Sequence, residues 1–130
     1  MAWQIPVIDR GEGATCLPAD LNRIDGNINY LLATSLKTDF TNNDILTVVQ
    51  WQNVIDSTMV ACAKYGVKCV QEPNADMTSA NFNNVENLLL QCYETLQQWQ
   101  EQAVTNVYVQ NQYDRYVNVP SDYYARGYNY

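Results

Sequence analysis

The sequence predicts a mainly α-helical fold, a three-helix bundle of helical repeats about thirty residues long, with extended arms at both ends. First, Pro18–Leu36 spaces its apolar residues alternately three and four apart, which gives one narrow apolar stripe on a helix. Second, a local pattern recurs in Thr47–Ile55 and Thr78–Glu86: a bulky apolar residue follows the helix start, and an aliphatic residue follows it three positions later. Third, Phe82–Ala103 continues in heptad-like steps.

The first 17 residues are expected to form an extended N-terminal docking arm. Trp3, Ile5 and Val7 alternate as in a half-buried strand, and Pro6 confines such a strand to an edge. Isolated apolar residues on a terminus gain stability only by covering a surface. We therefore predict that these three side chains bind a neighbouring subunit, and a frayed terminus is the alternative.

The predicted bundle spans residues 18–103, and its first helix runs from Pro18 to Leu36. Pro18 fits the first helical position, where its missing N–H costs nothing. Gly26 inside the helix weakens it by about 1 kcal/mol relative to alanine, so the helix must depend on packing. Gly26 either lets another backbone approach closely or is simply tolerated.

The second predicted helix starts near Thr47 and ends at Tyr65. Thr47 and Gln50 have the spacing of a capping box, and Gly66 is a natural left-handed stop. A disulfide between Cys62 and Cys69 would staple the turn that follows in an oxidising compartment.

Two other roles are open to the cysteines. The four residues could bind one zinc ion, but no CxxC pair occurs. Alternatively, Cys62 and Cys92 are small buried hydrophobic residues on helix faces.

The third predicted helix runs from Ser79 to about Ala103, roughly 37 Å at 1.5 Å per residue. Its heptad register fits one side of the bundle core. A second hypothesis is that Leu96–Ala103 packs against symmetry mates, and Trp99 is the predicted contact residue there.

The last predicted segment, Val104–Tyr130, is a tyrosine-rich C-terminal arm. Tyrosine offers a large contact area, few rotatable bonds and a hydroxyl group, so binding surfaces favour it. We predict that this arm docks on protein, and a disordered tail is the alternative. Seven of the chain's ten tyrosines lie here and are candidate partner-binding residues: Tyr108, Tyr113, Tyr116, Tyr123, Tyr124, Tyr128 and Tyr130.

Composition argues against several functions. A net charge of -7, with seven scattered basic residues, is unsuited to gripping nucleic acid through its phosphates. The apolar runs are far shorter than the ~20 residues that a membrane span requires. Histidine is absent and no carboxylate pair is marked out, so we expect no enzyme, no metal and no cofactor. A polar surface with only 16% charged residues is typical of assembled structural proteins.

The stretch DLNRIDGNINYL, Asp20–Leu31, resembles a motif of virion proteins from phages and prophages of Gram-positive bacteria. The family pattern is an aromatic-containing N-terminal stretch, a turn, and then D-[LM]-N-R-I-[ED]-[GN]-N-I. Trp3 and the DRGEGA joint occupy the matching upstream places. The resemblance implies a minor structural component of a tail or appendage. Longer members often carry fibre or lectin-like modules after the motif.

Two functions follow as hypotheses. In the first, the chain is a small adaptor or attachment subunit of a tail, collar or fibre complex. It would assemble in the host cytoplasm, reside in the virion, and bind copies of itself and other virion proteins as a homo-oligomer. Arg23, besides pairing with Asp20, would then reach a partner's carboxylate. The alternative is a host-recognition subunit that uses the tyrosine-rich arm.

Overall fold

The computed structural model describes residues 2–69, 73–74 and 76–118. The chain divides into two units, Met1–Thr95 and Leu96–Tyr130. Within the described residues all regular structure is helical, as the sequence predicts. The first unit holds residues 18–95 of the predicted bundle together with the N-terminal segment that the sequence treats as a separate arm, and residues 96–103 of that predicted bundle fall in the second unit.

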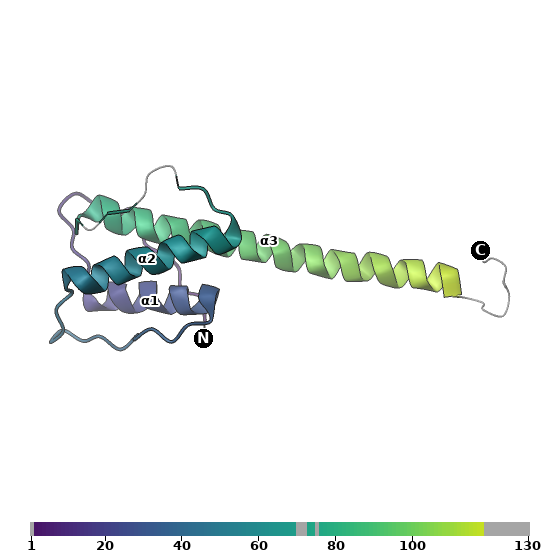
Figure 1. Ribbon diagram of the computed structural model, residues 1–130, viewed down its shortest axis with the longest axis horizontal. Helices are drawn as coiled ribbons and strands as arrows, with labels where there is room; N and C mark the ends of the chain where they lie inside the picture. Colours follow the sequence, from purple (N-terminus) through teal and green to yellow (C-terminus); the bar gives the residue numbers. More distant parts are fainter. Residues whose placement is uncertain (1, 70–72, 75, 119–130) are drawn as a thin grey trace. The chain divides into compact units, whose positions relative to one another are not determined.

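Three helices follow one another along the chain: α1 (Pro18–Leu32), α2 (Val48–Tyr65) and α3 (Ser79–Asn118). In the first unit, α1, α2 and the beginning of α3 pack beside one another, and the chain between α1 and α2 runs back along α1 (Figure 1). The bundle is therefore flanked by extended backbone that needs polar partners of its own.

The predicted repeat is confirmed at the start of each helix. The first backbone hydrogen bond always leads from the bulky apolar residue to the carbonyl four positions earlier, and each bulky side chain is at most 4% exposed. The same starting geometry thus places one large residue of each helix in the common core. The donor and acceptor pairs are Leu21 and Leu17, Trp51 and Thr47, and Phe82 and Thr78, at 3.1, 3.0 and 3.0 Å.

The core is formed by the predicted stripes of the three helices. The rings of Trp51 and Phe82 meet edge to face, with centroids 4.9 Å apart and an interplanar angle of 84°. Aliphatic residues three positions after each bulky residue complete this layer. They are Ile24, Val54 and Val85, at 0%, 4% and 0% exposure.

The first helix ends four residues earlier than predicted, at Leu32. Ala33 takes a left-handed conformation at φ 56°, and its N–H donates to Asn29 O. The Asn29 side chain then accepts hydrogen bonds from the Thr34 hydroxyl and the Leu36 N–H. This side chain offers the following backbone an alternative to the helix, which is why the apolar pattern alone placed the end too late.

The second helix has the predicted boundaries. The Thr47 side chain accepts from Gln50 N, and the Gln50 side chain accepts from Thr47 N. Gly66 closes the helix at φ 68°. Capping residues with defined side-chain chemistry locate a helix end better than hydrophobic spacing does.

The third helix is longer than predicted, and the expectation that residues 104–118 belong to an extended arm is wrong. The helix continues from Ala103 through Asn118, across the β-prone valines Val107 and Val109. Valine and tyrosine lower helix propensity by only tenths of a kcal/mol, and residues 79–118 contain no glycine or proline. Pro120, which cannot continue a helix, comes two residues after the end.

Four asparagine side chains tie extended backbone to the helices. Each carboxamide accepts from the N–H and donates to the C=O of one residue, at 2.8 to 3.1 Å, as a neighbouring strand would. We call these contacts asparagine clamps. Two hold the N-terminal segment and two hold the chain between α1 and α2. The clamped pairs are Asn27 and Gln4, Asn83 and Arg10, Asn22 and Phe40, and Asn29 and Leu36.

Gly26 lies beside Gln4, the residue held by the first clamp. A Cβ placed on Gly26 would meet the Gln4 side-chain nitrogen at 3.0 Å, and the next atom, in Thr38, lies 3.9 Å away. The tight neighbour is the end of an exposed, flexible side chain rather than backbone. Gly26 is therefore a tolerated glycine and not a point of close backbone approach.

Candidate functional site

The N-terminal residues predicted to bind a partner have different surroundings. Trp3 stacks on Tyr93 at 4.2 Å with an interplanar angle of 1°, and its edge meets Tyr30 at 6.0 Å. Val7 is half-buried and its carbonyl accepts from Arg10, whereas Ile5 is 86% exposed. The chain's own bundle thus covers much of Trp3. The predicted docking of this segment on another subunit stays a prediction, and Ile5 is the side chain most available for it.

Arg23 reaches a carboxylate of its own chain. Its Nε and Nη2 atoms donate to the two oxygens of Glu86, both at 2.7 Å, and Nη2 also donates to Asp20 at 2.7 Å. Arg10 donates to the same Glu86 carboxylate and lies 3.6 Å from Asp20. We call these four residues the charge cluster.

The charge cluster is buried and internally neutral. The Glu86 side chain is 1% exposed and Arg10 is 6% exposed, with Arg23 at 14% and Asp20 at 17%. Partial burial opposes ionisation of Asp20, but hydrogen bonds from Leu17 N–H and Arg23 hold its pKa below the usual value. Two arginines and two carboxylates at these distances join the N-terminal segment, α1 and α3, so the cluster is a structural joint.

The sequence contains signals for Glu86 that the search for catalytic pairs overlooked. Glu86 lies four positions after Phe82 and one after Val85, so helical geometry places it beside the core stripe of α3. A carboxylate at such a place requires cationic partners. Its partners in the structure are Arg10 of the turn and Arg23 of the first helix.

Asp25 is a second buried acid that sequence inspection missed. It lies on the buried face of α1 between Leu21 and Ile28, is 6% exposed, and its Oδ1 has no hydrogen-bond partner among the described residues. Burial raises its pKa from 3.8 to about 7. Asp25 lines a cavity of about 150 Å³ together with Phe40 and Val54. The sequence signal for this site is an acidic residue within the apolar stripe of α1.

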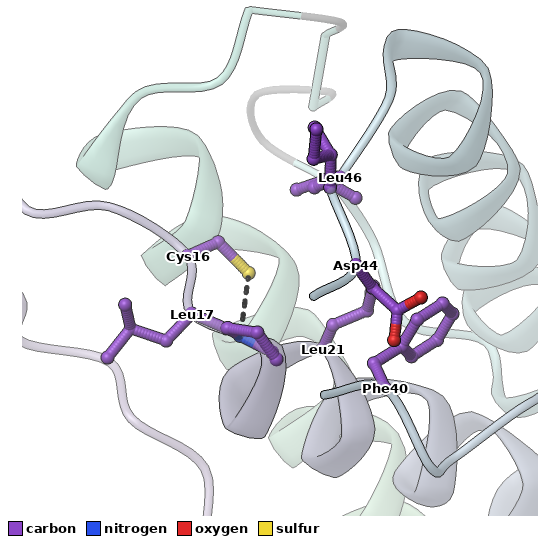
Figure 2. Close-up of a pocket in the computed structure, with 8 residues that line it drawn as sticks. Cys16, Leu17, Leu21, Phe40, Asp44 and Leu46 are labelled. Carbon is purple, nitrogen blue, oxygen red and sulfur yellow. Dashed lines mark hydrogen bonds between the residues drawn. The ribbon is translucent and has the colours of Figure 1, made fainter. Parts of the chain in front are cut away.

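A smaller cavity lies beside the start of α1 (Figure 2), and its volume is about 40 Å³. Leu17 and Leu21 line it from α1 and its cap, and Phe40 and Leu46 line it from the chain that leads to α2. The Cys16 thiol donates to Leu17 O at 3.9 Å, and burial raises the pKa of this thiol to about 12. Cys16 is therefore a protonated, weakly nucleophilic thiol.

None of the four cysteines is in a disulfide. The predicted interpretation of Cys62 and Cys92 as small core residues is confirmed, since they are 2% and 0% exposed. They lie side by side on α2 and α3, and their mutual hydrogen bond raises the pKa of Cys62 and lowers that of Cys92. The staple to Cys69 is not formed; the Cys69 thiol contacts Met59 sulfur at 3.8 Å.

The predicted C-terminal site residues lie on α3 or beyond it. Trp99 is 45% exposed. Three of the tyrosines, Tyr108, Tyr113 and Tyr116, fall within the helical residues of α3. The other four lie outside the described residues: Tyr123, Tyr124, Tyr128 and Tyr130.

The apolar stripe of α3 changes from buried to exposed along the helix. Its members are buried through Cys92, half-buried at Leu96, and exposed at Trp99, Ala103 and Val107. We call Leu96, Trp99, Ala103 and Val107 the α3 seam. Over residues 96–107 the seam is accompanied by five glutamines and asparagines and a single charged residue, Glu101. Such a surface is poor in the charge that usually faces water.

Other site types are not found among the residues described. That part of the chain holds no group of three or more His, Cys, Asp or Glu side chains placed to bind a metal ion. None of its helices combines the length and hydrophobicity needed to cross a bilayer. Comparisons with protein-family models, curated proteins and solved structures find no match to this chain.

Proposed function

We propose that this chain is a structural subunit of a phage virion, an adaptor that assembles with its own copies through the second half of α3. The single observation that carries the proposal is the α3 seam. Its heptad-like register is buried in the first unit and then presents Trp99, at 45% exposure. Val107, four residues after Ala103 and 60% exposed, continues the apolar stripe one position beyond that register. A helix whose apolar stripe is exposed gains most of its stability by packing that stripe against a partner.

A second copy of the chain is the partner that this surface fits. Only one residue in positions 96–107 is charged, so two copies of the seam would meet with little like-charge repulsion. Interface cores are depleted in charge and enriched in tryptophan, as here. Seams with heptad spacing pack side by side as coiled coils, in which the same positions of each helix meet.

The virion assignment is supported by the resemblance of Asp20–Leu31 to minor structural proteins of phage particles. The structure gives most members of that motif an internal role, since Asn22, Arg23 and Asn27 all bind the chain's own segments. In this proposal the motif builds the bundle, and the bundle holds the seam for assembly. An adaptor of this kind acts through protein contacts alone.

Quantitative mass spectrometry of purified particles tests the virion assignment. Particles from the host that encodes the chain are banded on a density gradient and digested, and the peptides are compared with those of the major capsid and tail proteins. The proposal predicts peptides of this chain at a fixed molar ratio across the particle band. Their absence from intact particles, with the chain abundant in the infected-cell lysate, would contradict it.

A further inference from the structure

The cavity beside Asp25 is lined by one buried acidic residue and several apolar side chains. Leu21, Leu36 and Phe40 line it together with Asp25. Asp25 is 6% exposed, and its Oδ1 has no hydrogen-bond partner in the described part of the chain. A buried carboxylate without a hydrogen-bond partner raises the free energy of the folded state. A cationic hydrogen-bond donor is therefore the ligand that would stabilise this site most.

The described part of the chain does not supply that donor itself. Lys37 also lines the cavity, but its Nζ lies 4.9 Å over the Phe40 ring and 3.9 Å from Asp39. Burial raises the pKa of Asp25 to about 7, and no salt bridge joins its carboxyl to a lysine or arginine of the described residues. The remaining polar lining residues, Gln50 and Asn53, are neutral.

We propose that this cavity is a binding site for a primary alkylammonium group, with the ammonium on Asp25 and the alkyl chain against the apolar walls. The size agrees with such a ligand: an apolar protein cavity of about 150 Å³ can hold benzene, which has six non-hydrogen atoms, and butylammonium has five. The Phe40 ring favours the same ligand, because a cation is attracted to an aromatic face.

The shared chemistry has two sources, a free alkylamine or the end of a lysine side chain. Both place a chain of four carbons and one ammonium in the cavity. The exposed residues among the lining, Lys37 and Asn53, mark the side from which either would enter. The site does not depend on the α3 seam, so its test is independent of the proposed function.

Amide and carboxyl NMR of the full chain tests the proposal. At pH 8, where Asp25 is ionised, n-butylammonium is expected to give saturable shifts at the cavity residues. Binding should weaken by about ten- to a hundredfold in Asp25→Asn, the range expected when a hydrogen bond to a charged group loses its charge. A matched probe, n-butanol, has the same length without the charge and should bind far more weakly than the amine.

Two further arms complete the design. Lys37→Met removes the ammonium at the rim and should strengthen binding of butylammonium, which also keeps the test valid if Asp25→Asn fails to fold. A blocked tripeptide with a central lysine should bind if the source is protein, whereas binding of butylammonium alone indicates a free amine. The proposal would be overturned if butanol bound as tightly as butylammonium, or if folded Asp25→Asn bound butylammonium with the affinity of the native chain. The absence of binding by any amine would overturn it as well.

Discussion

Glu86 is the residue on which the charge cluster depends. Its carboxylate accepts hydrogen bonds from both Arg10 and Arg23, and with a side chain 1% exposed it has no access to water. A buried ion pair is weak evidence of net stabilisation, but removing one partner leaves uncompensated charge. Glu86 therefore contributes mainly by neutralising two arginines.

Replacing Glu86→Gln should lower the free energy of unfolding by about 3 kcal/mol, because two buried guanidinium groups lose their common counter-charge. Urea unfolding followed by circular dichroism measures the change. Glu94→Gln, at an exposed position of the same helix, is the control and should stay within about 0.5 kcal/mol of the native chain. A loss in Glu86→Gln no larger than in the control would show that the cluster is unimportant for stability.

Asp25 gives stability a pH dependence of a definite sign. Burial raises its pKa from 3.8 to about 7, so between these values the folded state binds more protons than the unfolded state. Stability from this group is full below pH 3.8 and falls as the pH rises toward 7. Lys37 is the charged side chain that shares its cavity.

Asp25→Asn removes that dependence because the amide has no proton to lose. The free energy of unfolding of the variant minus that of the native chain should be about 1 to 3 kcal/mol larger at pH 8 than at pH 5, since one pKa unit corresponds to about 1.4 kcal/mol. Parallel urea titrations at the two pH values measure this gain. An unchanged difference between the two proteins would show that the carboxyl ionises normally in the folded state.

At the scale of the elements, the asparagine clamps explain why helices of low intrinsic propensity form a defined bundle. Asparagine in a helix is ordinarily unfavourable because its side chain competes for backbone groups. Here Asn22, Asn27 and Asn83 use that capacity on extended backbone beside the helices. The packed backbone segments are thereby satisfied without a β-sheet.

Asn83→Ala should release the N-terminal segment around Arg10, because both backbone groups of that residue bind the Asn83 carboxamide, at 3.0 and 3.1 Å. Limited digestion with trypsin, followed by mass spectrometry, measures the rate of cleavage after Arg10. The variant should be cut at least about tenfold faster, as expected for a loss of about 1.4 kcal/mol in local stability. Asn53→Ala, exposed on α2, is the control and should be cut like the native chain. Equal rates in the three proteins would rule out the clamp as the restraint.

Periodicity and caps made much of the fold predictable. The three core stripes, the first turns, Thr47 and Gly66 all follow from local patterns, and each is present in the structure. The end of α1 did not follow, because the Asn29 side chain competes with the helix over a distance of seven residues. The end of α3 was not predicted correctly either. The low helix propensity of its valines suggested an extended arm, although residues 79–118 contain no glycine or proline to end the helix.

The candidate sites were less predictable than the fold. Which acid meets which arginine depends on the three-dimensional packing, and the partners Arg23 and Glu86 are 63 residues apart. Arg23 was therefore singled out as a contact residue without its true partner. Asp25 required knowledge that no donor faces it, which sequence spacing does not contain. The exposure of Trp99 likewise emerges only when the packed part of α3 is known.

At the scale of the whole molecule, the chain combines a self-sufficient first unit with a helix whose seam is exposed. The first unit satisfies its charges through the charge cluster and its extended backbone through the clamps. Residues 96–107 present apolar and amide side chains with one charge. The central claim is that copies of the chain associate through this stretch.

Sedimentation equilibrium of the native chain, Trp99→Glu and Val60→Glu tests that claim most directly. Val60 is the matched control, an apolar side chain 58% exposed on α2, outside the seam. The account predicts oligomers for the native chain and Val60→Glu, and monomers for Trp99→Glu with the thermal unfolding of the first unit unchanged. A native chain that stays monomeric at every concentration, or association that survives Trp99→Glu, would contradict it.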